Sequence, residues 1–244
     1  MQQRKVLHRV LALTIAAMLG IVGYALHQEV WTNYASHMRA TKVRDHLVTQ
    51  WQHGHAVTHT SSNWQAIRGR TSAVSNGASS KGISQSDAFA LLYIPRLGNH
   101  VWATPVLEGI NPPELDSGVG HYVGTALPGD LGNFAVAGHR ATYGEPFAYF
   151  DHLQHGDRVY VRTFSNWYVY VLDKSLMVKP SDVWVIDPQP GQLARTVPSD
   201  RLISLVTCDP RWGSVRRWVW WGHLVATHPR NEPPLEVRKL QAMR

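Results

Sequence analysis

The pattern of hydrophobic positions divides the chain into one long apolar run near the N-terminus and a series of short apolar stretches in the second half. The long run covers residues 10–26, VLALTIAAMLGIVGYAL, carries no charge and follows Arg4, Lys5 and Arg9. A helix of this length, with its apolar neighbours, approaches the ~30 Å hydrocarbon thickness of a bilayer. Positive charges before a span favour a cytoplasmic N-terminus. The pattern therefore predicts a transmembrane signal anchor at 10–26, with residues 1–9 cytoplasmic and the later residues extracytoplasmic in a single-pass cell-membrane protein.

A cleaved signal peptide is the alternative interpretation of the same run. The run is long for the apolar part of a signal peptide. No small-x-small pattern of a cleavage site follows it before His27. An uncleaved anchor is therefore the favoured interpretation.

Three polar segments flank the short apolar stretches. Residues 27–59 carry a mixed, amphipathic pattern that indicates a helix at the membrane surface and predicts a juxtamembrane stalk. Residues 60–87 are rich in Ser, Gly, Asn and Thr and contain almost no large apolar residues, so they predict a flexible linker. Residues 229–244 form a polar C-terminal tail with room for a short terminal helix.

Residues 88–228 are predicted to form a mostly β domain. Its apolar stretches have the length and the Val, Tyr, Trp and Phe content of strands: AFALLYIP, NFAVAGH, RVYVRTF, WYVYVL, LISLVTC and RWVWWGHLVAT. Only Ser165 and Asn166 separate the third stretch from the fourth, which predicts a tight hairpin. Many short strands with few helices, such as one at Glu145–Leu153, indicate a barrel or a sandwich.

Composition and charge limit the classes of function. With 44% hydrophobic and 17% charged residues, most of the chain must fold. The net charge is 24 − 17 = +7, but the basic residues are scattered, so we expect no nucleic-acid partner and favour an anionic lipid or wall polymer. A single cysteine excludes an intramolecular disulfide and a thiolate zinc cluster.

That cysteine, Cys208, is the first candidate for chemistry. It ends the stretch LISLVTC and is followed by Asp209 and Pro210, so a strand is expected to deliver it to a sheet edge. A lone cysteine is more often a small buried hydrophobe. An extracytoplasmic thiol at a strand end is instead exposed to oxidation, and this position favours catalytic use.

Histidine and arginine candidates lie at two further strand ends. His139 closes NFAVAGH and would supply a general acid or base near neutral pH, although any one of the 14 histidines is more often a surface side chain. Arg216 and Arg217 begin the stretch after Cys208, and either guanidinium could return towards the thiol to stabilise an oxyanion. The residues alone leave the choice between these two arginines open.

A cluster of tryptophans follows the cysteine: Trp212, Trp218, Trp220 and Trp221. They could form a platform for carbohydrate or peptide, but strand alternation predicts two in the core and two at the surface or in a groove. A place in the core is the default interpretation.

Three separated motifs resemble one family. They are GVGHYVGTALPGDLGN at 118–133, AGHRATYGEPF at 137–147 and LVTCDPRWGSVRRWVW at 205–220. In this order, after a membrane anchor, they resemble the sortases, the cysteine transpeptidases of Gram-positive cell surfaces. The resemblance extends over residues 89–227 and is strongest to the class E sortases of actinobacteria. One departure is Ser204, which stands where the family motif has threonine and keeps a hydroxyl there.

The resemblance implies a fold and a set of roles. The fold would be a closed eight-stranded β-barrel with short helices. Cys208 would be the nucleophile, His139 the general acid/base, and Arg217, which directly precedes the apolar strand, the oxyanion or substrate contact. Thr207, Val206 and Asp209 would be candidate substrate contacts.

The resemblance also implies substrates and partners. The enzyme would cleave an LAxTG- or LPxTG-like sorting signal between Thr and Gly and join the surface protein to a peptidoglycan-precursor amine of lipid II type. No cofactor or metal is expected. Three alternatives remain: a pilus-polymerising class C enzyme, whose usual Asp-Pro-aromatic lid is missing between residues 28 and 89; a peptidase that only hydrolyses; and a wall-binding module without catalysis.

Overall fold

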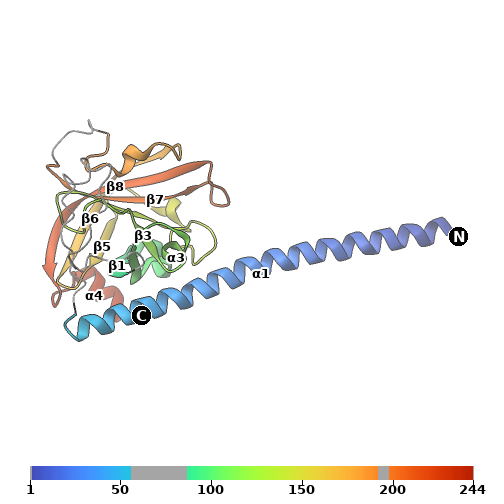
Figure 1. The fold of residues 1–244 in the computed structure, drawn as a ribbon, viewed down its shortest axis with the longest axis horizontal. Helices are drawn as coiled ribbons and strands as arrows, with labels where there is room; N and C mark the ends of the chain where they lie inside the picture. The colour runs from blue at the N-terminus through green and yellow to red at the C-terminus, as the bar shows by residue number, and fades with distance from the viewer. Residues whose placement is uncertain (1, 56–86, 192–197, 244) are drawn as a thin grey trace, which may run out of the picture.

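The strands form one closed barrel with a long helix leaving it (Figure 1). The structure is a computed structural model that describes residues 2–55, 87–191 and 198–243. Around the barrel the order is β1-β2-β3-β4-β7-β8-β6-β5. The strands are β1 (Ala88–Tyr93), β2 (Thr104–Glu108), β3 (Val119–His121), β4 (Gly132–Ala137), β5 (Arg158–Arg162), β6 (Asn166–Val178), β7 (Arg201–Asp209) and β8 (Arg216–Pro229).

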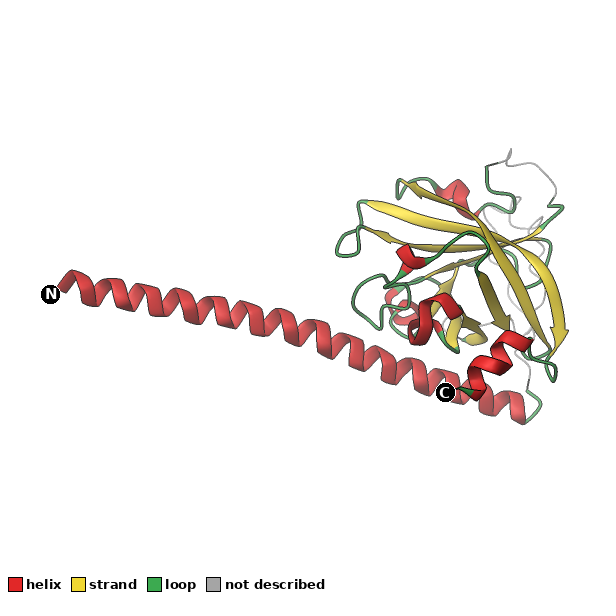
Figure 2. Ribbon diagram, turned by 180° about the vertical axis from the view of Figure 1, so that it is seen from behind, coloured by secondary structure: helices red, strands yellow, loops and turns green. Residues whose placement is uncertain are grey.

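The helical elements are few and, after the first, short. They are α1 (Gln2–Gln52), α3 (Pro112–Leu115), α4 (Leu235–Ala242) and the 3-10 helices η1 (Pro95–Val101), η2 (Phe150–His152) and η3 (Val183–Ile186). Figure 2, coloured by secondary structure, shows them around the outside of the barrel. The predicted closed eight-stranded barrel with short helices and one long N-terminal helix is confirmed.

Two strand pairings bring the candidate residues to one end of the barrel, at the C-terminal ends of β4 and β7 and the start of β8. We call this end of the barrel the edge. β4 runs parallel to β7, with Ala137 opposite Val206, and β7 runs antiparallel to β8, with Cys208 opposite Arg217. Side chains alternate between the two faces of a strand. In β7, Leu205 belongs to the barrel interior, whereas Val206 packs in a separate cluster on the outer face. Cys208 therefore shares the outer face with Val206.

The N-terminal helix α1 has two different halves. By length and composition alone, it is long and apolar enough to cross a membrane, and its apolar window is not buried in the structure. Its C-terminal end packs on the barrel, where Leu47 and Trp51 are buried against β1 and β6. The Arg230 guanidinium also donates a hydrogen bond to the Trp51 carbonyl oxygen at 3.1 Å. Much of the predicted stalk is thus a helix that the barrel holds.

The other predicted segments have mixed outcomes. The linker predicted at 60–87 lies outside the described residues except for Asp87. The C-terminal tail contains α4, whose Val237 is buried in the same cluster as Trp51. The predicted hairpin forms as β5 and β6, which pair antiparallel.

One predicted helix is wrong. Of the segment Glu145–Leu153, only the three residues of η2 are helical. Thr142, Tyr143 and Glu145 have positive φ angles, and Pro146 follows, so the chain turns sharply here instead of beginning a helix.

Candidate active site

Cys208 and Arg217 face each other across the β7–β8 ladder. They are directly opposite in register, and alternation puts both side chains on the outer face of the barrel. Cys208 is a free thiol that is partly exposed to solvent. The Arg217 guanidinium donates hydrogen bonds to the carbonyl oxygens of Ser214 and Arg216, at 3.1 and 3.2 Å. The register therefore favours Arg217 over Arg216 as the arginine beside the thiol.

His139 reaches the same edge from β4. It lies two residues beyond Ala137, as Cys208 lies two residues beyond Val206, and those two residues are partners in parallel strands. The pairing continues past the end of β4, because the Gly138 N–H donates to the Val206 carbonyl oxygen at 3.1 Å. Both strands therefore deliver their candidate residue to one edge of the barrel.

The surroundings of His139 adjust its basicity. Burial lowers the pKa of the imidazole, and the nearby Asp116 carboxylate opposes that shift. Asp116 Oδ1 lies 3.5 Å from His139 Nε2, and the Tyr143 ring lies 5.4 Å from the imidazole ring. The Asp116 carboxylate therefore lies on the Nε2 side of the imidazole ring.

Replacing Asp116 by asparagine is expected to lower the pKa of His139 further. The carboxylate stabilises the imidazolium, so its loss leaves burial unopposed and moves protonation to lower pH. Titration of the His139 ring protons by NMR in the wild-type chain and in Asp116→Asn measures the shift. Asp173→Asn, at the exposed His223–Asp173 pair, is the matched control and should leave His139 unchanged. An unchanged or raised His139 pKa in Asp116→Asn would contradict the assignment.

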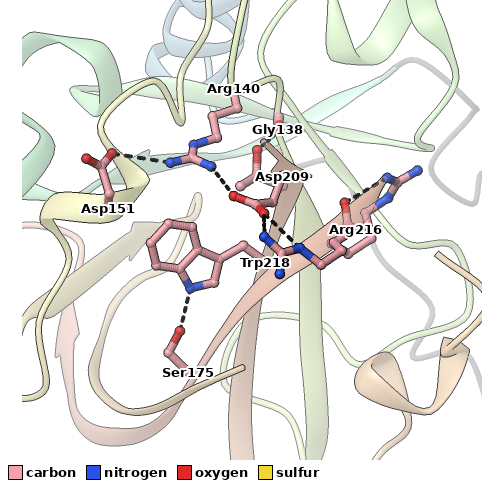
Figure 3. Close-up of polar contacts among 9 residues, drawn as sticks. Gly138, Arg140, Asp151, Ser175, Asp209, Arg216 and Trp218 are labelled. Carbon is pink, nitrogen blue, oxygen red and sulfur yellow. Dashed lines mark hydrogen bonds and ion pairs between the residues drawn. The ribbon is translucent and has the colours of Figure 1, made fainter. Parts of the chain in front are cut away.

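An ionic network centred on the buried Arg140–Asp209 pair lies on the opposite face of the same strand ends (Figure 3). Arg140, directly after His139, donates to Asp209 Oδ1 at 2.7 Å, and Asp209 directly follows Cys208. Arg216 donates to the other oxygen of Asp209, also at 2.7 Å. Arg140 further lies 3.5 Å from Asp151 and stacks over the Trp218 ring at 4.9 Å. The network ties β4, β7 and β8 together beneath the candidate residues.

The predicted substrate contacts are largely occupied by the protein itself. Thr207 is buried and donates its hydroxyl hydrogen to the Gly138 carbonyl oxygen at 2.8 Å. Val206 is buried in the outer cluster, and Asp209 is held between Arg140 and Arg216. Contact of these three residues with substrate stays a prediction.

Sequence reasoning did not find Tyr122, which lies beside the candidate residues. Burial raises the pKa of its phenol, while the charge of Arg217 lowers it and that of Cys208 raises it, so both groups are close. Tyr122 also packs against the outer apolar cluster that contains Val206. Neither Tyr122 nor Asp116 was assigned to the site from the sequence, because neither lies near Cys208 or His139 along the chain.

Within residues 2–55, 87–191 and 198–243, no three His, Cys, Asp or Glu side chains gather in a group that could hold a metal ion. Activity without a cofactor remains an expectation.

The fold and this edge define a class of protein: a closed β-barrel that presents a free thiol opposite an arginine, with a histidine on the adjoining strand end. Such an arrangement suits acyl transfer through a cysteine. The Sortase domain family model matches residues 92–225, which is more than half of the chain. The chain therefore belongs to the sortase family, whose members are cysteine transpeptidases.

Several relatives are of the E class. Sortase SrtE1 of Streptomyces coelicolor is 36% identical over 86% of this chain and 54% of its own length. The structure of sortase E from Streptomyces avermitilis is 42% identical, with a TM-score of 0.56, and covers 63% of this chain and 98% of that one. Sortase E1 from Streptomyces coelicolor, solved with a tripeptide in its active site, is 38% identical, with a TM-score of 0.56. The match covers 64% of this chain and 99% of that one.

These similarities confirm the predicted resemblance to class E sortases. The chain spans about half the length of the curated relatives that it matches.

Proposed function

We propose that this chain is a membrane-anchored cysteine transpeptidase that joins surface proteins to a cell-wall precursor. The observation that carries the proposal is the register that sets Cys208 opposite Arg217 and brings His139 to the same edge. Its substrate would be an LAxTG- or LPxTG-like sorting signal, and its acceptor a peptidoglycan-precursor amine. Membership of the sortase family and similarity to class E sortases support this choice.

The proposed first step forms a thioester. The Cys208 thiolate attacks the carbonyl carbon of the Thr–Gly bond, and the tetrahedral oxyanion is stabilised by Arg217 and by backbone N–H groups. The C–N bond then breaks as the His139 imidazolium donates its proton to the departing glycine amine. The enzyme is left acylated on sulfur with a neutral imidazole.

The proposed second step returns the enzyme to its starting state. The acceptor amine attacks the thioester carbon and gives a proton to His139. The C–S bond breaks, the new amide leaves, and thiolate and imidazolium are restored. Water in place of the amine would give hydrolysis instead of transfer.

The anchor is part of the proposal. α1 would cross the membrane with residues 10–26, and the basic residues Arg4, Lys5 and Arg9 before this run favour a cytoplasmic N-terminus. The barrel would then lie outside the cell, where wall precursors are available to it.

Mass spectrometry of the full chain in nanodiscs, incubated with LAxTG and LPxTG peptides, tests the reaction. With an added amine we expect a peptide–amine product, and the better peptide identifies the signal class. Peptide cleavage without any transfer to the amine would favour a hydrolase. A folded protein that forms no thioacyl adduct with either peptide would overturn the proposal in favour of a binding module.

Arg217→Ala is expected to lower kcat by about 10²-fold, the usual cost of losing one donor to an oxyanion. Arg217→Lys keeps the positive charge and should retain part of the rate, although it loses the planar guanidinium. Steady-state kinetics with the preferred peptide separate kcat from KM. A change in KM alone would assign Arg217 to substrate binding, and unchanged kinetics would remove it from the site.

A further inference from the structure

The turn between β7 and β8 exposes two large apolar side chains that the proposed reaction does not use. Trp212 is 64% exposed and Val215 is 75% exposed. The Arg211 guanidinium lies 5.3 Å from the Trp212 ring centroid. A tryptophan and an aliphatic side chain held in water beside arginine are typical of a protein surface that enters the boundary of a membrane. We call these two residues the β7–β8 tip.

The direction of the tip follows from the arrangement of the fold. Figures 1 and 2 both show the turn between β7 and β8 at the end of the barrel from which the N-terminal half of α1 projects. β8 runs away from this end, so that its later residues and α4 lie on the far side of the barrel. The tip therefore points in the direction of the apolar run of α1.

One hydrogen bond between α1 and the barrel relates the height of this barrel end to the apolar run. The Gly144 N–H donates to Asn33 Oδ1 of α1 at 2.9 Å, and Gly144 belongs to the loop that begins at His139. Asn33 lies seven residues beyond Leu26, the last residue of the apolar run, which is about 10 Å along a helix. The headgroup layer on each side of a bilayer is about 5–8 Å thick. The His139 loop therefore lies just outside that layer.

The helix itself carries side chains suited to the same layer. Trp31 and Tyr34 are both exposed, and they follow Leu26 by five and eight residues. Tryptophan and tyrosine gather where a membrane-spanning helix leaves the hydrocarbon. The exposed aromatic residues of α1 thus lie at about the same height as Asn33, which contacts the His139 loop.

The charge of the turn also suits anionic lipid. Residues 211–217 contain three arginines and no acidic residue. Glu145 pairs with Arg211 and Asp209 pairs with Arg216, at 2.9 and 2.7 Å, which leaves Arg217 without an ion pair among the described residues. The surface around the tip is therefore weakly positive.

We propose that the β7–β8 tip, Trp212 and Val215, enters the headgroup layer of the membrane that α1 spans, and so holds the candidate active site at the lipid surface. This inference rests on the anchor proposed above. It gives the barrel two attachments to the membrane, one through α1, which belongs to the same chain, and one through the tip. A lipid-linked acceptor would then meet the thiol without leaving the bilayer surface.

Site-directed fluorescence on the full chain tests the docking. In a Cys208→Ala background, Val215→Cys is labelled with the NBD fluorophore and reconstituted in nanodiscs of phosphatidylcholine and phosphatidylglycerol. Val225→Cys is the matched control, because Val225 is also an exposed valine of the β8 region, at 48% exposure, and lies towards the far side. We expect lipids with a shallow doxyl group to remove most of the emission at position 215 and none at 225.

A third label separates failure of the docking from failure of the anchor. Leu19→Cys, inside the apolar run, should be quenched by lipids with a deep doxyl group if α1 spans the bilayer. Quenching at 19 with none at 215 would overturn the docking and leave the anchor in place. No quenching at 19 or 215 would overturn both. A spectral shift at 215 that needs a sorting-signal peptide and no lipid would assign the tip to peptide binding and also overturn the docking.

Discussion

Cys208→Ala is expected to abolish peptide cleavage and transfer, with a loss of roughly 10⁴-fold or more, as for other enzymes that lose their nucleophile. The proposed reaction has no route around the thioester, and Cys208 is the only cysteine in the chain. Liquid chromatography with mass detection of the peptide–amine product measures the loss. Intact-protein mass spectrometry should show the thioacyl adduct on the wild-type chain and none on the variant.

The control for Cys208→Ala is a substitution away from the barrel end that carries Cys208, His139 and Arg217. Val225→Ala alters an exposed side chain near the far side of the barrel and should keep the wild-type rate. Because the thiol is unique and partly exposed, a maleimide should modify the wild-type protein once, at Cys208, and stop the reaction. Transfer that persists in Cys208→Ala would remove the cysteine from the mechanism.

Asp209→Asn is expected to lower the free energy of unfolding by about 3–5 kcal/mol, the cost of breaking a buried ion pair from one side. The side chains of Asp209 and Arg140 are only 8% and 9% exposed, and their contact is 2.7 Å. Asparagine keeps the shape but leaves the Arg140 guanidinium without its closest anion. Urea denaturation of the full chain in detergent, followed by tryptophan fluorescence, measures the change.

The same variant should also slow the reaction of the protein that remains folded. Asp209 directly follows Cys208 and Arg140 directly follows His139, so the ion pair fixes the two strand ends relative to each other. Misplacing reacting groups lowers turnover more than binding, and we therefore expect kcat to fall while KM changes little. A fall in stability with unchanged kcat would show that the pair supports the fold alone.

Two comparisons sharpen this prediction. Arg96→Gln breaks another close Arg–carboxylate pair, with Asp157, but the Arg96 side chain is 45% exposed, so the loss of stability should be much smaller than in Asp209→Asn. In a double-mutant cycle, Arg140→Gln and Asp209→Asn should be strongly non-additive because both break one contact. A loss in Asp209→Asn no larger than in Arg96→Gln would contradict the prediction.

Several features were predictable because they are encoded locally. An uncharged run of 17 residues predicts a long apolar helix, and α1 contains it. Stretches rich in Val, Tyr and Trp predict strands, and the stretches ending near His139 and Cys208 become β4 and β7. In each case the signal lies in residues that are neighbours in the chain. It can therefore be read without knowing which strand or helix packs against them.

Other features could not be read in this way. β3 has only three residues and β2 five, too few for an alternating pattern to be distinguished from a loop. β3 exists as a strand because it pairs with β2 on one side and β4 on the other. Tyr143 has a positive φ, which sequence propensity does not foresee for a bulky residue.

By itself, the sequence determined the apolar helix, most of the strands and the positions of a lone thiol and a histidine at strand ends. Only the tertiary structure decided which residues lie beside them. Ala137 and Val206 become partners although 69 positions separate them, and the register of β8 selects Arg217 for the face of Cys208. The packing of α1 on the barrel was equally hidden, since Trp51 meets β1 and β6 only in the folded chain. Hydrophobic periodicity is a property of neighbouring residues, whereas pairing and burial depend on the surfaces that distant segments present to one another.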